Sequence, residues 1–84
     1  MPYIDQARRE ELLDCHDWPE TPGELNFLIT NQLNRYVTQQ RLSYQTINDC
    51  LGALEGAKLE FYRRIVVPYE EKKRLENGDV YPPN

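Results

Sequence analysis

The stretch TINDCLGALEGAKLEFYRRIVVPYEEK, residues 46–72, decides the fold, because its apolar residues recur at helical spacing over most of its length. Ser43 is a predicted N-cap, and Leu42 is placed to form a hydrophobic staple with the first helical turn. The pattern predicts one helix over residues 43–67, about 37 Å long at 1.5 Å per residue. Its apolar face is formed by Ile47, Cys50, Leu51, Leu54, Ala57, Phe61 and Ile65, with Tyr62 and Val66 beside them.

A proline interrupts this helix. Pro68 has no N–H to donate, and its ring collides with the carbonyl four residues earlier. Val67, directly before it, is β-branched and disfavours the helical conformation. We therefore predict a kink or a split at Pro68, a helical arm over residues 69–77 that ends before Gly78, and an extended tail over residues 78–84.

The N-terminal half carries two further helix signals. TPGE is typical of a capping box, since Thr21 can cap the helix, a proline follows, and Glu24 stands at the third helical position. We predict a helix over residues 21–40. A more polar helix is predicted over residues 5–15, and Trp18 is expected to end that segment and fill the core.

Together these elements predict an all-α protein with a single helical domain over residues 1–84. Its architecture is expected to be a helical hairpin with a short N-terminal helix and a long, proline-kinked C-terminal helix. A compact domain of this length is only about 30 Å across, so the long helix would extend beyond it. Because the exposed apolar face needs a cover, and a second copy supplies one, we predict a homo-oligomer.

Composition limits the kinds of partner and the cellular compartments that are expected for this chain. The net charge of −4 argues against double-stranded nucleic acid as a partner, and no apolar run approaches the ~20 residues that cross a membrane. The N-terminus, MPYIDQARREE, is charged where a secretory signal is apolar. We expect a soluble, cytoplasmic protein in which Cys15 and Cys50 are reduced rather than bridged, with no zinc at His16.

Small residues form a second pattern in the long helix. A glycine inside a helix costs about 1 kcal/mol relative to alanine, so two glycines within GALEGA indicate a packing requirement. Tight helix–helix contact is the first interpretation, and a ligand against the bare backbone is the alternative. The tail is expected to lie on its own chain or on a neighbour. The positions predicted to pack are Gly52, Ala53, Gly56, Ala57, Val80 and Tyr81.

Acidic and basic side chains alternate at helical spacing along residues 55–64. The simplest interpretation is a solvated face whose charges pair with one another. The alternative is an anion site, because arginine forks bind phosphate in a bidentate manner and tyrosine rings stack on bases. The candidate anion contacts are Tyr62, Arg63, Arg64, Tyr69, Lys72 and Lys73.

The chain offers little for catalysis. Nucleophilic catalysis needs a serine or cysteine beside a positioned base, and the only histidine of the chain, His16, lies at the end of the most polar helix. Helical nucleotide pyrophosphohydrolases hold magnesium with carboxylate clusters on adjacent helices. The nearest approach is Asp14 with Asp17, or Glu24 with Asp49 and Glu55. We expect a non-enzymatic protein with no catalytic residue, cofactor or metal.

Three segments carry a resemblance: MPYI at the start, GELN at residues 23–26, and INDCLGALEGAKLEFYRRIVVPYEEKKRLENGDVY at residues 47–81. They resemble an uncharacterised family of short bacterial and phage proteins, which implies a phage or prophage setting and no assigned activity. The run from Arg64 to Glu70 is also similar in layout to viral sponge proteins. These are small helical oligomers that sequester cyclic nucleotides from bacterial defence systems.

Three functional hypotheses follow. The first is a non-enzymatic binding or interaction protein, phage-encoded and working as a homo-oligomer. The second, implied by the sponge resemblance, is an anti-defence protein that binds an anionic nucleotide signal. The third is a magnesium-dependent nucleotide pyrophosphohydrolase.

Overall fold

The computed structural model describes residues 3–14 and 17–83, which form helices and connecting segments without a strand among them. The all-α class is therefore confirmed. The chain divides into two compact units, Met1–Cys50 (the first unit) and Leu51–Asn84 (the second unit).

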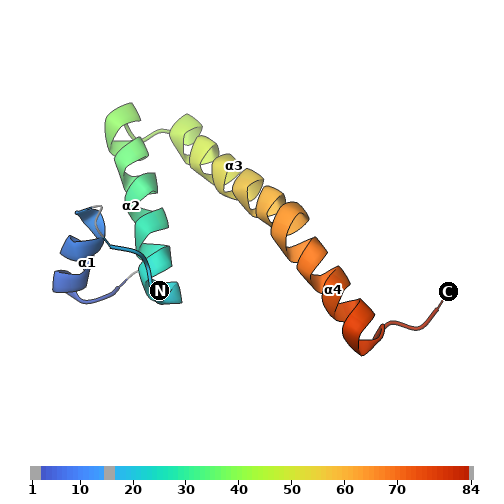
Figure 1. Cartoon of the computed structure of the whole chain (residues 1–84). Coiled ribbons are helices and arrows are strands. Elements are labelled where there is room, and N and C mark those ends of the chain that lie inside the picture. Colours follow the sequence, from blue (N-terminus) through green and yellow to red (C-terminus); the bar gives the residue numbers. More distant parts are fainter. Residues whose placement is uncertain (1–2, 15–16, 84) are drawn as a thin grey trace. The chain divides into compact units, whose positions relative to one another are not determined.

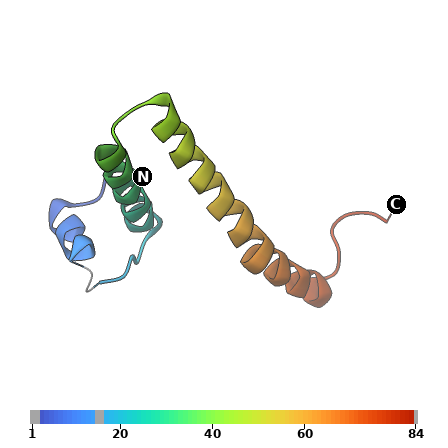
Figure 2. The same ribbon diagram turned by 90° about the horizontal axis from the view of Figure 1, so that it is seen from above.

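The first unit is built around two helices that pack together. Helix α1 (Gln6–Leu13) contacts α2 (Pro22–Gln40), and the two lie side by side in Figures 1 and 2. Leu12 is 4% exposed and is the only buried apolar side chain in the described part of the chain. At the edge of this contact, the guanidinium of Arg9 lies over the ring of Phe27, 6.0 Å from its centroid. The core of the first unit is thus very small.

Helix α2 begins at the predicted cap. Thr21 is extended (φ −133°, ψ 159°), and its hydroxyl accepts a hydrogen bond of 3.1 Å from the N–H of Glu24. The carboxylate of Glu24 accepts from the N–H of Glu20 at 2.9 Å, one residue before the position that a standard capping box would use. The cap predicted at Thr21 is confirmed, with its return bond displaced by one residue.

Helix α3 (Tyr44–Phe61) also begins at its predicted cap. The hydroxyl of Ser43 accepts from the N–H of Thr46 at 3.2 Å, and the hydroxyl of Thr46 accepts from the N–H of Ser43 at 2.9 Å. Leu42 is 73% exposed, so the predicted hydrophobic staple does not bury it. The Tyr36 hydroxyl donates to Asp49 at 2.9 Å and links α2 to the first turns of α3.

The long C-terminal helix is confirmed, and it continues through its proline. Helix α3 is followed by a π-helical turn, η1 (Tyr62–Val66), and by α4 (Val67–Asn77), and the ribbon runs on without a break in Figures 1 and 2. The N–H of Val67 donates to the carbonyl of Tyr62, five residues earlier. This wider turn accommodates a residue that has no N–H. The interruption predicted at Pro68 therefore takes the form of a π-helical turn.

The helix ends where the asparagine–glycine pair predicts. Gly78 has a φ of 87°, in the left-handed region that glycine adopts without strain, and its N–H donates to the carbonyl of Arg74 at 2.8 Å. Residues 79–83, which follow, are neither helix nor strand.

The expectation that Trp18 fills the core is wrong, because its side chain is 81% exposed. Its backbone is fixed instead. The guanidinium of Arg8 donates to the Trp18 carbonyl at 2.7 Å, and a carboxylate oxygen of Asp17 accepts from the Trp18 N–H at 3.0 Å. These polar contacts hold the loop while the indole ring stays in solvent, and Leu12 takes the buried position.

Candidate functional site

The second unit leaves the apolar side chains of its helix exposed. None of its described residues is buried. A helix in a protein gains most of its stability by packing an apolar face, and the second unit supplies no core for that purpose. The exposed fractions run from 37% at Leu54 to 73% at Leu75 in the set Leu51, Leu54, Leu59, Phe61, Tyr62, Ile65, Val67, Tyr69 and Leu75.

Six of these side chains share one face of the helix, which we call the apolar stripe. Positions 51, 54, 58, 61, 65 and 69 follow one another three or four residues apart, the spacing that places side chains above one another on a helix. Tyr62 lies next to Phe61 on the same face. Lys58 is the charged residue at this spacing between Leu54 and Phe61. The apolar stripe consists of Leu51, Leu54, Phe61, Tyr62, Ile65 and Tyr69.

The six positions predicted to pack are exposed to solvent. A methyl group added at Gly52 or Gly56 would meet no atom within 4 Å, and the helical spacing places both glycines on the side away from the apolar stripe. Ala53 and Ala57 are also exposed. In the tail, Val80 is 90% exposed and Tyr81 79% exposed. Contact at these six positions stays a prediction about a second chain.

Alanine at Gly52 and Gly56 is expected to raise the free energy of unfolding by about 1 kcal/mol at each site, because glycine is the poorer helix former and each position has room for a methyl group. Urea unfolding followed by circular dichroism measures the change. Gly78→Ala is the control: its φ of 87° strains an alanine, so this variant should lose stability. Destabilisation by the first two changes would mean that the glycines pack tightly.

The two adjacent arginines pair within their own helix. Arg63 and Arg64 both form ion pairs with Glu60, and their side chains are 71% and 75% exposed. This arrangement matches the simpler of the two predicted interpretations, a solvated face whose charges pair with one another.

Lys73 and Tyr69 of the predicted anion site have local contacts as well. The ammonium of Lys73 lies 5.6 Å from the centre of the Tyr69 ring and 3.6 Å from the carboxylate of Glu76. Lys72 is exposed on the same helix. The guanidinium groups and these lysines therefore lie on separate turns, and Arg63, Arg64 and Lys73 are each close to acidic or aromatic neighbours within the helix.

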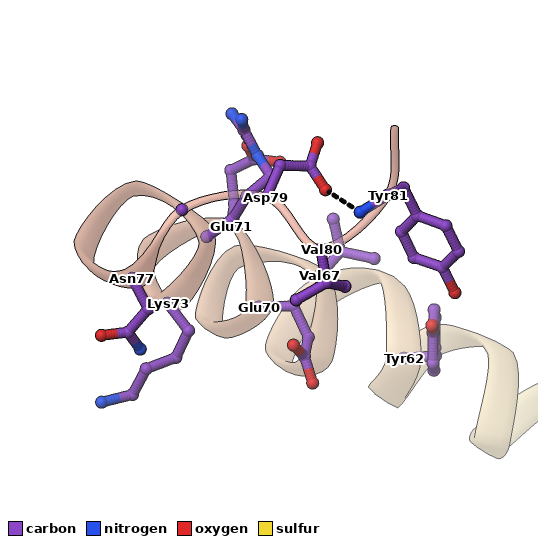
Figure 3. A pocket seen from close by; sticks show the side chains of 11 residues that line it. Tyr62, Val67, Glu70, Glu71, Lys73, Asn77, Asp79, Val80 and Tyr81 are labelled. Atoms are coloured by element: carbon purple, nitrogen blue, oxygen red, sulfur yellow. Dashed lines mark hydrogen bonds and ion pairs between the residues drawn. The ribbon is translucent and has the colours of Figure 1, made fainter. Parts of the chain in front are cut away.

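A pocket of about 380 Å³ lies between α4 and the tail that follows it (Figure 3). Of the six predicted anion contacts, only Tyr62 and Lys73 line it. Arg74, also in its wall, forms an ion pair with Glu71. Acidic side chains outnumber basic ones, so the pocket does not concentrate positive charge for a phosphate. Its charged lining residues are Glu70, Glu71, Asp79, Lys73 and Arg74.

The first unit contains an ion-pair network that the sequence analysis missed. The guanidinium of Arg8, whose side chain is 17% exposed, pairs with Glu24 at 2.8 Å, with Glu11 at 3.0 Å and with Asp17. The hydrogen bonds that Arg8 donates to Glu24 and Asp17 raise the pKa of Arg8 above its ordinary value. In turn, the Arg8 guanidinium holds the pKa of the Asp17 carboxyl and that of the Glu24 carboxyl below their ordinary values. This network ties the loop before α2 to α1.

Four of the five carboxylates considered for magnesium, Asp17, Glu24, Asp49 and Glu55, have other partners. Glu24 belongs to the Arg8 network, and Asp49 accepts hydrogen bonds from Tyr36 and, at 2.7 Å, from Gln45. The bond to Asp49 raises the pKa of Tyr36 above its ordinary value. Glu55 lies 3.8 Å from the ammonium of its neighbour Lys58.

The described residues contain neither a metal-binding cluster nor a membrane-spanning helix. Across residues 3–14 and 17–83, no group of three or more His, Cys, Asp or Glu side chains is arranged so that it could hold a metal ion. No helix in that part of the chain is both long and apolar enough to cross a bilayer. Cys50 is a half-buried free thiol, whereas the predictions for Cys15 and His16 concern residues outside the described ones.

A family model described as "Domain of unknown function (DUF6899)" matches residues 1–80. No curated protein and no solved structure matches the chain. The predicted relationship to an uncharacterised family is therefore confirmed, and the phage setting and the likeness to sponge proteins stay predictions.

Proposed function

We propose that this chain, which belongs to the DUF6899 family, is a non-enzymatic interaction protein that works as a homo-oligomer. The observation that carries the proposal is the exposure of the apolar stripe, whose six side chains are 37–60% exposed. Folded monomers rarely leave a contiguous apolar surface of this extent in water. A partner chain that covers the stripe would supply the core that the second unit lacks.

A second copy is the most economical partner. Every copy exposes the same stripe, and other copies are produced wherever the protein is made. The resemblance to phage and bacterial proteins supports a setting in a bacterial cytoplasm. The nucleotide-sponge hypothesis has weaker support, because the pocket contains two of its six predicted contacts and more acidic than basic side chains.

The test is the mass of the unmodified chain in solution. Sedimentation equilibrium at tens of micromolar is expected to give a multiple of the 10.0 kDa chain mass. Dilution is expected to lower the helical circular dichroism signal, since association stabilises the folded helix by mass action. A mass of one chain at every concentration, with unchanged helicity, would refute the proposal. A rise in Tm with cyclic nucleotides would favour the sponge hypothesis instead.

A further inference from the structure

We infer that two copies pair through the apolar stripe, stripe against stripe, as a closed dimer with twofold symmetry. The inference rests on the proposed homo-oligomer and adds its surface and its stoichiometry. The occupant of the stripe is the same stripe of a second chain.

Full coverage of the stripe would bury an area at the lower end of the range for stable dimers. Its side chains are about half exposed, from 37% at Leu54 to 60% at Phe61. At on the order of 100 Å² for each side chain, the six contribute about 600 Å² per copy and about 1,200 Å² per pair. This value reaches the lower end of the range for specific protein–protein interfaces.

The π-helical turn keeps the stripe straight. Phe61, Ile65 and Tyr69 are four residues apart, and in a regular α-helix of 3.6 residues per turn such a series drifts around the axis. A π-helical turn holds more residues, so the series stays closer to one line across η1. Pro68, which favours this turn, thereby places Tyr69 in the same face as Phe61.

The charges of the second unit allow two copies to approach. Residues 51–84 contain six acidic and six basic side chains, so the unit is neutral, whereas residues 1–50 contain eight acidic and four basic ones. Two second units therefore meet without net repulsion, and two first units do not. Lys58 is compatible with contact between two apolar stripes, because its aliphatic stem can lie over apolar side chains while its ammonium stays near Glu55, 3.8 Å away.

The geometry points to a dimer rather than a longer assembly. Each copy has one stripe, and pairing two stripes uses both, so no equivalent surface is left for a third chain. The other exposed apolar side chains of the second unit are Leu59 and Val67 to the side of the stripe, Leu75 near the end of α4, and Val80 and Tyr81 in the tail. They are divided among these places and form no second stripe of six. The face of Gly52 and Gly56 stays in solvent in such a dimer, which therefore differs from the tight packing that the sequence predicts at these glycines.

The first experiment measures dimer dissociation of full-length variants by sedimentation equilibrium. Phe61→Glu and Ile65→Glu place a charge in the stripe and are each expected to weaken association by about a hundredfold or more. Leu59→Glu is the matched control. It makes the same kind of change on the same helix, at a side chain of similar exposure (55%) that lies outside the stripe, and it should leave the dimer intact. Gly56→Ala should leave it intact as well.

A second measurement needs no variant and so does not depend on the folding of one. Hydroxyl-radical footprinting of the unmodified chain, read by mass spectrometry, reports which side chains reach solvent. At high protein concentration, Phe61 and Ile65 are expected to be protected several-fold relative to a dilute sample, and Leu59 is expected to react equally in both.

The outcomes separate this inference from the proposal beneath it. A single-chain mass for the unmodified protein would refute both. An oligomer larger than a dimer would refute the inference alone, as would a dimer that survives Phe61→Glu and Ile65→Glu or one that Gly56→Ala disrupts. Protection of Leu59 in place of Phe61 in the footprinting experiment would also refute the inference alone.

Discussion

Replacing Leu12 with alanine is expected to lower the free energy of unfolding of the first unit by about 3 kcal/mol. Leu12 is 4% exposed and is the only apolar side chain buried in the described residues. Truncation removes its transfer free energy and leaves a cavity, which together cost about 2–5 kcal/mol in protein cores. In so small a unit this loss is a large share of the total stability. Hydrogen–deuterium exchange of the amides of α1 and α2 measures it.

Leu42→Ala is the matched control for this change. Leu42 belongs to the same unit but is 73% exposed, and substitutions at exposed positions usually change stability by no more than about 0.5 kcal/mol. Equal exchange rates in the two variants would show that the contact between α1 and α2 does not depend on Leu12. In that case the polar contacts of Arg8 and Arg9 would have to hold the helices together.

The helices of this protein are predictable because their signals are local. Thr21 and Ser43 cap helices through atoms only three residues away, and Gly78 ends α4 through its own backbone conformation. The pairing of Arg63 and Arg64 with Glu60 is also set by helical spacing alone. Each of these features is decided within one turn of chain, so the sequence is sufficient to predict it.

The features that were missed depend on the path of the chain between helices. Asp17 and Glu24 reach Arg8 only because the loop before α2 returns to α1, and no short-range pattern encodes that return. Trp18 is misplaced by the sequence analysis for the same reason, since its size favours burial but the backbone contacts of its loop leave it outside. Arg41, with a φ of 72°, occupies a conformation for which the sequence offers no glycine.

The sequence predicts that Pro68 disturbs the long helix, but it does not predict how the helix responds. Residue type alone shows that Pro68 removes a hydrogen bond, but the helix has several ways to respond to that loss. Here the preceding turn widens, with Val67 donating to Tyr62. That choice decides which side chains continue the apolar stripe, so the surface proposed for association depends on a detail that spacing does not determine.

Acidification is expected to destabilise the first unit through the Arg8 network. The folded protein lowers the pKa of Asp17 from an ordinary value of 3.8 and that of Glu24 from 4.5. Stabilisation from a lowered carboxyl pKa is fully present above the unfolded pKa and is lost as the pH falls through the folded pKa. Arg8 stays charged throughout this range, because a guanidinium is protonated at any acidic pH. Stability should therefore fall from about pH 5 downwards, with up to about two protons taken up on unfolding.

Urea unfolding at a series of pH values measures this dependence. The signal is the fluorescence of the chain's single tryptophan, Trp18, which follows Asp17 of the network in the sequence. Arg8→Met is expected to lower the stability at neutral pH and to flatten its dependence on pH, because both carboxyls then lose the largest cause of their lowered pKa. Only the hydrogen bonds from the N–H groups of Trp18 and Glu20 continue to lower the pKa of Asp17 and that of Glu24. Arg9→Met is the control, since it removes the same charge from the same helix at a residue whose contacts are the Phe27 ring and a backbone carbonyl. Equal flattening in both variants would mean that overall charge, rather than the Arg8 network, produces the effect. A pH dependence unchanged in Arg8→Met would show that the network does not link the stability of the first unit to protonation.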